Sequence, residues 1–155
     1  MLLWFVIIAA VILLDQVSKM LTVTFLKAMD TLPLWEDVLH LTYVENRGAA
    51  FGMLSDQRWV FMVVSSVAIV AMLGYMVWKK PTSKLEGLAI AFIVGGGIGN
   101  MIDRLTLGYV VDMIDFRLIN FAVFNVADSF VCVGAGLLIL SLILDIIKEN
   151  KEKSK

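Results

Sequence analysis

Four aspartates stand close together in the chain, between two segments apolar enough to sit in lipid: Asp103, Asp112, Asp115 and Asp128. A carboxylate near a membrane is costly to keep there, so by default it marks a functional site. Asp112 and Asp128 each end a short apolar run. Two close carboxylates share one proton, so that one can activate water as a base while the other protonates a substrate carbonyl. We therefore predict that Asp112 and Asp128 form a catalytic pair.

The remaining residue types limit the alternatives. The chain has one histidine, His40, and one cysteine, Cys132, which makes a Ser–His or Cys–His nucleophile and a zinc site of several His or Cys ligands implausible. We interpret His40 as a structural or surface residue and Cys132, which stands in an apolar run, as a packing residue. What remains is oxygen chemistry, in which carboxylates hold a hard metal ion or an aspartate pair activates water.

The apolar residues come in long runs. They make up 60% of the 155 residues, against about half in a typical soluble domain, and runs of about 20 match the hydrocarbon thickness of a bilayer. The sequence predicts one integral membrane domain, residues 1–155, of the all-α class with a small β-rich cap. We expect four transmembrane helices, at residues 2–26, 58–78, 85–102 and 126–147, followed by a frayed basic tail.

The polar connection between the first two spans is expected to form that cap, as a small sheet or an amphipathic layer. Residues 39–44 alternate and are β-prone, which predicts a strand, and 45–48 is a turn signal. Residues 49–54 could return as a second strand. The segment 46–54 holds two glycines and is a candidate lid over the site. The spacer 30–39 has no pattern of its own.

The spans carry further signals. The glycines at 95, 96, 97 and 99 fit neither a dinucleotide nor a P-loop spacing, so they predict close helix packing. Asp15 and Lys19 are four residues apart and can pair on one helix face. A self-neutralising pair and a direct role in binding both remain open for them. Asp103 beside Arg104 predicts a local ion pair, and Asp115 an exposed loop charge.

Basic residues set the expected orientation. The turn between the second and third spans holds Lys79, Lys80 and Lys84, and the tail holds four lysines, whereas each of the opposite loops holds two basic residues. The positive-inside rule then places both termini in the cytoplasm and the Asp112–Asp128 pair at the outer face. The net charge of −1 gives no indication of a nucleic-acid partner.

Five short motifs follow one another along nearly the whole chain, and together they resemble bacterial lipoprotein signal peptidase (signal peptidase II). They are DQVSK at 15–19, NRGAAF at 46–51, GNMIDR at 99–104, VVD at 110–112 and FNVADS at 124–129.

The resemblance implies an aspartic endopeptidase of the bacterial cytoplasmic membrane. It implies removal of the signal peptide from prolipoproteins, with the cut just before a cysteine that carries diacylglycerol, and Asp112 and Asp128 as the catalytic residues. It implies no metal and no other cofactor, contact with membrane lipid, and inhibition by cyclic peptides of the globomycin type. Substrate-binding or supporting roles fall on Asp15, Lys19, Asn46, Gly48, Asn100, Arg104 and Asn125.

The residues alone leave some roles open. Asp128 opens the fourth span, where a carboxylate could simply cap the free backbone N–H groups, and Asp112 could be an ordinary exposed loop residue. Asn100 and Asn125 should form hydrogen bonds within the site, because an unsatisfied amide in hydrocarbon is costly. Arg104 could anchor the outer interface or hold the substrate.

Three other functions compete with the peptidase. A small proton-coupled carrier or channel would use the carboxylates as a relay, although they cluster at one face rather than crossing the bilayer. An intramembrane protease of the Gly-x-Gly-Asp type would need an aspartate where Asn100 follows Gly99. A metal-dependent phosphatase or lipid hydrolase would depend on its ion, so a chelator distinguishes it.

Overall fold

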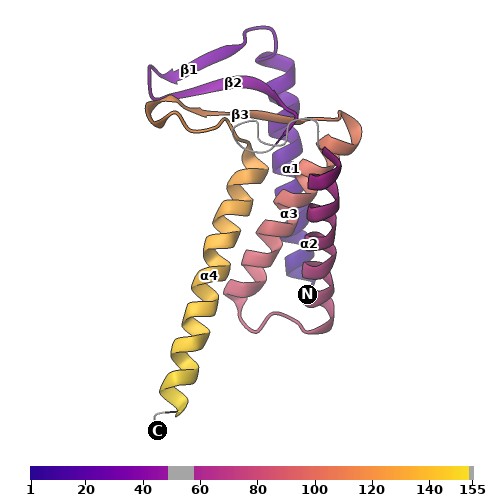
Figure 1. Cartoon of the computed structure of the whole chain (residues 1–155), viewed down its shortest axis with the longest axis vertical. Helices are drawn as coiled ribbons and strands as arrows, with labels where there is room; N and C mark the ends of the chain where they lie inside the picture. The colour runs from indigo at the N-terminus through magenta and orange to yellow at the C-terminus, as the bar shows by residue number, and fades with distance from the viewer. Residues whose placement is uncertain (49–57, 154–155) are drawn as a thin grey trace.

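The computed structural model describes residues 1–48 and 58–153. This part of the chain forms four α-helices, three strands and one short 3-10 helix, η2 (Figure 1). In chain order these are α1 (Leu2–Phe25), β1 (Thr31–Trp35), β2 (Leu39–Asn46), α2 (Arg58–Trp78), α3 (Lys84–Thr106), β3 (Val110–Phe116), η2 (Arg117–Ile119) and α4 (Val126–Lys153).

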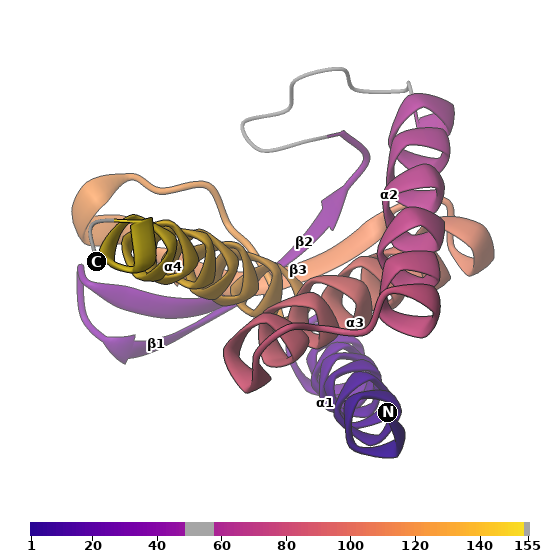
Figure 2. The same cartoon turned by 90° about the horizontal axis from the view of Figure 1, so that it is seen from below.

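Helix α3 is the centre of the bundle and contacts α1, α2 and α4 (Figure 2). Its glycines allow this close approach, as predicted. A Cβ at Gly95 would lie 2.8 Å from Cβ of Val11 on α1, and one at Gly96 would collide with the carbonyl oxygen of Ala127 on α4. Small residues thus let three backbones meet where the polar side chains of the site are gathered.

Three of the helices, α1, α3 and α4, are long and apolar enough to cross a membrane. The chain is therefore a multi-pass membrane protein. In α2 the apolar stretch among the described residues is the shorter segment Met62–Trp78, so the span predicted at 58–78 stays a prediction.

The three strands form one antiparallel sheet in the order β1-β2-β3, which lies across one end of the helices (Figure 1). The predicted strand at 39–44 is confirmed as part of β2. The expectation that the cap comes only from the connection between the first two helices is wrong, because β3 comes from the connection between α3 and α4. The patternless spacer also holds a strand, β1, because pairing with β2 completes its backbone hydrogen bonds.

Two predicted helix ends need correction. The third helix continues to Thr106 rather than ending at residue 102; its late carboxylate, Asp103, is 3% exposed and faces the protein interior. The fourth continues to Lys153 rather than fraying after 147, because lysine and glutamate are good helix formers even where nothing packs on them. The second strand, predicted at 49–54, and most of the candidate lid, predicted at 46–54, lie outside the described residues.

Candidate active site

Asp112 lies in β3, which pairs with β2, and only 1% of it is exposed. It is therefore not an ordinary loop aspartate. Its Oδ2 accepts a hydrogen bond of 2.8 Å from Nδ2 of Asn46, the last residue of β2. Its Oδ1 accepts one of 2.6 Å from Nδ2 of Asn125. Sheet pairing thus carries Asp112 to the end of β2, and two amides fix its carboxylate.

Asp128 is the third residue of α4. Its Oδ1 accepts a hydrogen bond of 2.7 Å from Nδ2 of Asn100 on α3, and its Oδ2 accepts one of 3.2 Å from the backbone N–H of Asn125. The backbone N–H of Asp128 in turn donates to Oδ1 of Asn125 at 2.9 Å. This reciprocal arrangement caps the helix start. The capping role and a place in the site are therefore compatible, since one carboxylate does both.

Asn125 joins the two aspartates. It is fully buried and its Nδ2 donates both to Asp112 and, at 3.0 Å, to Oδ1 of Asn100, while its Oδ1 accepts from the backbone of Asp128. The prediction that Asn100 and Asn125 form hydrogen bonds within the site is therefore confirmed.

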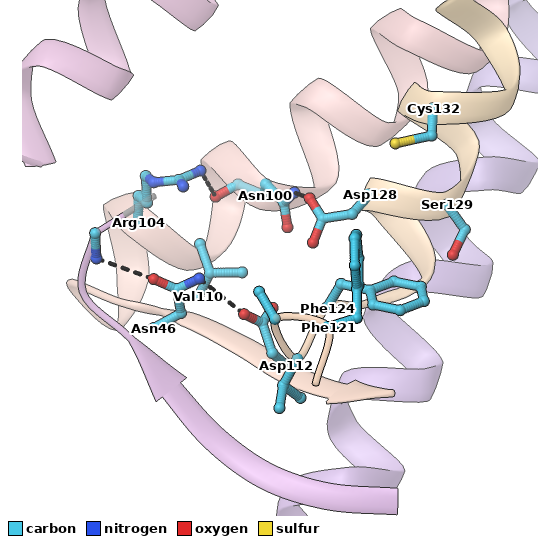
Figure 3. A pocket seen from close by; sticks show the side chains of 13 residues that line it. Asn46, Asn100, Arg104, Val110, Asp112, Phe121, Phe124, Asp128, Ser129 and Cys132 are labelled. Atoms are coloured by element: carbon cyan, nitrogen blue, oxygen red, sulfur yellow. Dashed lines mark hydrogen bonds between the residues drawn. The ribbon is translucent and has the colours of Figure 1, made fainter. Parts of the chain in front are cut away.

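A cavity of about 520 Å³ opens beside the pair. Figure 3 shows Asp112 and Asp128 facing it from different elements, with Arg104 at one end. Cys132 also lines it and is exposed, so the prediction that this cysteine is a packing residue is wrong. The lining is Asn46, Gly48, Asn100, Arg104, Val110, Asp112, Phe121, Ala122, Val123, Phe124, Asp128, Ser129 and Cys132.

A second cavity of about 260 Å³ lies among α2, α3 and α4. It shares three residues with the first, namely Asn100, Arg104 and Asp128, and otherwise has mostly apolar walls, which include Ile69, Ile93 and Val131. Asp128 therefore borders both hollows.

Apart from Asn125, which joins the two aspartates, the predicted supporting residues divide into two groups. Asn46, Gly48, Asn100 and Arg104 line the larger cavity, and the backbone N–H of Gly48 donates to Oδ1 of Asn46 at 3.0 Å.

Asp15 and Lys19 lie behind Asn100 instead. They form the predicted ion pair, at 2.9 Å, but both are buried and neither is among the residues that line the two cavities.

Sequence reasoning missed two residues of this buried group. Asp103 was expected to pair with its neighbour Arg104; instead its carboxylate lies 3.1 Å from Nζ of Lys19. Gln16 donates from Nε2 to Oδ1 of Asp103 at 3.0 Å. The available signal was spacing, because Asp103 comes one helical turn after Asn100 and so shares its face.

Two other predicted side chains belong to the sheet. Asp115 is not an exposed loop charge: it is half-buried in β3, where Oδ2 accepts from Thr42 at 2.9 Å and pairs with Arg117 at 3.0 Å. His40 is 5% exposed in β2 and lines neither cavity, as a structural residue would.

The surroundings of Asp112 change its acidity. Burial raises the pKa of its carboxyl to about 6, and the neighbouring charge of Asp128 adds to the rise, while hydrogen bonds from Asn46 and Asn125 oppose it. A carboxyl with this pKa can hold and release a proton near neutral pH, which suits general acid chemistry. In residues 1–48 and 58–153, no three or more His, Cys, Asp or Glu side chains are grouped so that they could bind a metal ion.

Comparison with known proteins identifies the family. A family model described as signal peptidase (SPase) II matches residues 7–144. This chain belongs to the signal peptidase II family. It is accordingly a peptidase, and its sequence resemblance to that family is confirmed.

Relatives and solved structures agree with this family. The chain is 50% identical over 133 residues to the lipoprotein signal peptidase of Caldanaerobacter subterraneus subsp. tengcongensis, which covers 86% of this chain and 90% of the relative. It is 47% identical over 138 residues to that of Halothermothrix orenii, covering 89% and 93%. A bacterial membrane enzyme solved by the in meso method at 2.3 Å resolution superposes with a TM-score of 0.85 at 31% identity, covering 92% of this chain and 88% of that one.

Proposed function

We propose that this signal peptidase II is an aspartic endopeptidase that cleaves the signal peptide from diacylglyceryl-modified prolipoproteins, just before the lipidated cysteine. One observation carries the mechanism: Asp112 and Asp128, from separate elements, line one cavity and are both bonded to Asn125. The substrate class is supported by relatives of high coverage that are named lipoprotein signal peptidases.

The pair begins the reaction with one shared proton. Asp112 is the better place for it, because burial raises the pKa of that carboxyl to about 6. Negative charge is favoured in the first turn of a helix, where Asp128 lies. Asp128 therefore takes a proton from water as the oxygen attacks the scissile carbonyl carbon, and Asp112 gives its proton to the carbonyl oxygen.

The tetrahedral diol then collapses. The C–N bond breaks as Asp128 gives its proton to the leaving nitrogen, and Asp112 recovers a proton from a hydroxyl of the diol. The products are a carboxylic acid and the free amine of the lipidated cysteine, so the pair returns to its starting state. Asn46 and Asn125 hold Asp112 throughout, because each donates to a different oxygen of its carboxylate.

The cavity walls fit a substrate that stays partly in lipid. Phe121, Val123 and Phe124 form an apolar wall on one side of Asp128, and the second cavity offers another on the side of α2. The signal peptide and the two acyl chains are separate apolar parts, and these walls would let both remain in the membrane while the peptide bond reaches the pair. Arg104, which borders both cavities, is placed to hold a backbone or ester carbonyl.

The proposed orientation puts both termini in the cytoplasm and the site at the outer face of the bacterial cytoplasmic membrane. The sheet and the site are at one end of the helices (Figure 1). The turn between α2 and α3, with Lys79, Lys80 and Lys84, and the lysine-rich end of α4 are at the other end. This separation supports the orientation that the positive-inside rule predicts.

A cleavage assay in detergent tests the proposal. A synthetic prolipoprotein with and without diacylglycerol on its cysteine is incubated with wild type, Asp112→Asn and Asp128→Asn, each with EDTA. We expect wild type alone to cleave, only the lipidated form and despite EDTA, and a globomycin-type cyclic peptide to block it. The cleavage rate of each Asn variant should be lower than that of wild type by at least about 1,000-fold, because an amide cannot exchange the proton.

Other outcomes point elsewhere. Activity retained by either Asn variant would remove that residue from the pair, and cleavage that EDTA stops would mean that the carboxylates hold a metal. No cleavage of either form by folded protein would favour the proton-coupled carrier or channel.

A further inference from the structure

Lys19 is a buried cation whose three N–H groups all have partners. It is 3% exposed, and its Nζ lies 2.9 Å from Oδ2 of Asp15, 3.1 Å from Oδ2 of Asp103 and 2.8 Å from Oδ1 of Asn100. An ammonium has three donors and no acceptor, so this set of partners uses it completely. Lys19 thereby joins α1 to α3 through charged hydrogen bonds.

The first of these bonds leads to Asp128. Oδ1 of Asp15 accepts a hydrogen bond of 3.0 Å from the backbone N–H of Ala127, which directly precedes Asp128. The free N–H groups at a helix start need acceptors, and Asp15 supplies one from a helix 112 residues earlier in the chain. Asp15 therefore fixes where the first turn of α4 stands relative to α1.

The second bond leads to Asp112. Oδ2 of Asp103 accepts a hydrogen bond of 3.0 Å from the backbone N–H of Val111, which directly precedes Asp112. Val111 is 1% exposed, so this N–H has no access to water. Asp103 therefore fixes β3 against α3 at the residue next to the proposed acid.

The third bond sets the direction of an amide. Because Lys19 can only donate, Oδ1 of Asn100 faces it, and the NH₂ group of Asn100 must face the other way. That NH₂ group donates to Oδ1 of Asp128 at 2.7 Å. The charge of Lys19 thus decides that Asp128 meets a donor rather than an acceptor.

Two neighbours complete this arrangement. Gln16 donates from Nε2 to Oδ2 of Asp15 at 3.2 Å and to Oδ1 of Asp103 at 3.0 Å, so it bridges the same two carboxylates. Gly99 leaves room for them, because a Cβ there would lie 2.5 Å from Oδ2 of Asp15.

We propose that Lys19 is a positioning residue that sets Asp112 and Asp128 in register with each other, acting through Asp15, Asp103 and Asn100. Each of its three bonds continues, through one partner, to a catalytic aspartate or to the residue just before one. This inference rests on the proposed role of the pair. It predicts that removing the ammonium damages turnover itself, beyond any damage to folding.

Stability alone is a poor explanation for this cluster. Two carboxylates and one ammonium taken out of water are often no more stable than apolar residues of similar size. A displacement of about 1 Å in an active site, by contrast, can cost about 100-fold in rate. The geometry of the cluster is accordingly better explained by the precision that the pair requires.

The experiment compares kcat and KM, per mole of folded enzyme, for Lys19→Met, Asp103→Asn and the double variant. The substrate is the lipidated prolipoprotein, and binding of a non-cleavable analogue is measured separately. Asp103→Asn keeps an oxygen for the N–H of Val111 but loses the charge that attracts Lys19. The matched control is Glu86→Gln, which neutralises another buried carboxylate of α3 that lines neither cavity.

We expect Lys19→Met to lower kcat about 100-fold, with KM and analogue binding changed less than about 3-fold. Asp103→Asn should lower kcat about 10-fold. The double variant should be no slower than Lys19→Met alone, because the same connection is already broken. Glu86→Gln should keep the wild-type kcat.

Three results would overturn the proposal. One is a wild-type kcat for folded Lys19→Met; a second is losses that multiply in the double variant. If Lys19→Met does not fold, Asp103→Asn decides, and an unchanged kcat there is the third. Wild-type cleavage by Asp112→Asn would be different, since it would refute the proposed pair and the positioning role together.

Discussion

A carboxylate is buried near each end of α3, and the two carboxylates have different kinds of hydrogen-bond partner. At the end away from the sheet, Glu86 is 8% exposed and accepts from neutral donors. These are the hydroxyl of Tyr75 at 2.7 Å and the backbone N–H and hydroxyl of Thr82 at 2.6 and 2.8 Å. At the end near the sheet, Asp103 is 3% exposed and is held by the ammonium of Lys19.

The difference lies in where the hydrogen bonds lead. The partners of Glu86 are at most 11 residues away in the chain, so they fasten α2, a turn and α3 locally. The Lys19 group connects α1, α3, β3 and α4, and its bonds continue to residues next to Asp112 and Asp128. Neutral donors suffice to close a turn between two helices. In our proposal, a charge with several fixed partners is what holds two side chains from distant segments, Asp112 and Asp128, in register.

The variant with the largest expected effect is Asn125→Ala. It removes the side-chain amide that donates to Asp112 through Nδ2 and accepts from the backbone N–H of Asp128 through Oδ1. We therefore expect kcat to fall about 100-fold or more, equivalent to about 3 kcal/mol in the transition state. Steady-state kinetics with a thermal melt would measure it. An Asn125→Ala enzyme with normal kcat would show that the two aspartates are aligned without this amide.

Two glycine substitutions compare the ends of α3 directly. Cβ atoms at Gly99 and Gly87 would each lie 2.5 Å from a neighbour, Oδ2 of Asp15 in one case and the ring of Trp4 in the other. Overpacking of this kind costs about 1–3 kcal/mol, so both Ala variants should melt at a lower temperature. Only Gly99→Ala should also lower kcat, by about 10-fold, because Asp15 must move.

Gly136→Ala is the control for both substitutions. A Cβ there meets nothing within 4 Å, and alanine stabilises a helix by up to about 1 kcal/mol relative to glycine. The variant should therefore melt no lower than wild type. Equal loss of kcat in Gly87→Ala and Gly99→Ala would contradict the distinction between the two ends.

The pH dependence of stability tests the sheet end alone. The pKa of Asp112 is about 6 in the folded protein and about 3.9 in an unfolded chain. The native state therefore binds this proton more tightly, and its contribution to stability is complete at low pH and is lost as the pH rises through about 6. We expect about 2–3 kcal/mol to be lost between pH 4 and 8. Melting curves of Asp112→Asn, which cannot titrate there, should decline less; an equal decline would contradict this assignment.

The smallest expected effects are at the end away from the sheet. Tyr75→Phe removes one hydroxyl donor of Glu86 and should cost about 1 kcal/mol in stability, seen as a lower melting temperature. Its kcat should match wild type, because Tyr75 lines neither cavity. A slower Tyr75→Phe enzyme with unchanged folding would mean that this end also acts on the site.

The sequence was a good guide to features that depend on neighbouring residues. Long apolar runs predicted the helices, alternation predicted β2, and the i, i+4 spacing predicted the pairing of Asp15 with Lys19. Glycines in an apolar segment predicted close helix packing. Each of these signals is local, since it follows from hydropathy or from the period of one element.

It was a poor guide where a residue depends on distant partners. Asp103 was assigned to its neighbour Arg104, yet it bonds to Lys19, 84 positions earlier in the chain. Cys132 was assigned to packing, yet α4 turns it into the cavity. The segment that forms β1 has no alternating pattern that would predict a strand. It is a strand because its backbone pairs with that of β2.

The amino-acid sequence by itself thus determined the class of protein and the approximate positions of the helices, and it singled out the two aspartates that we propose as the catalytic pair, since composition, periodicity and ordered motifs are properties of the chain. Only the tertiary structure decided that Asp112 is buried, that Asn125 joins it to Asp128, and that Lys19 stands behind both. The physical reason is that a buried polar group must find its partner in space, and the chain folds that partner in from any distance along the sequence.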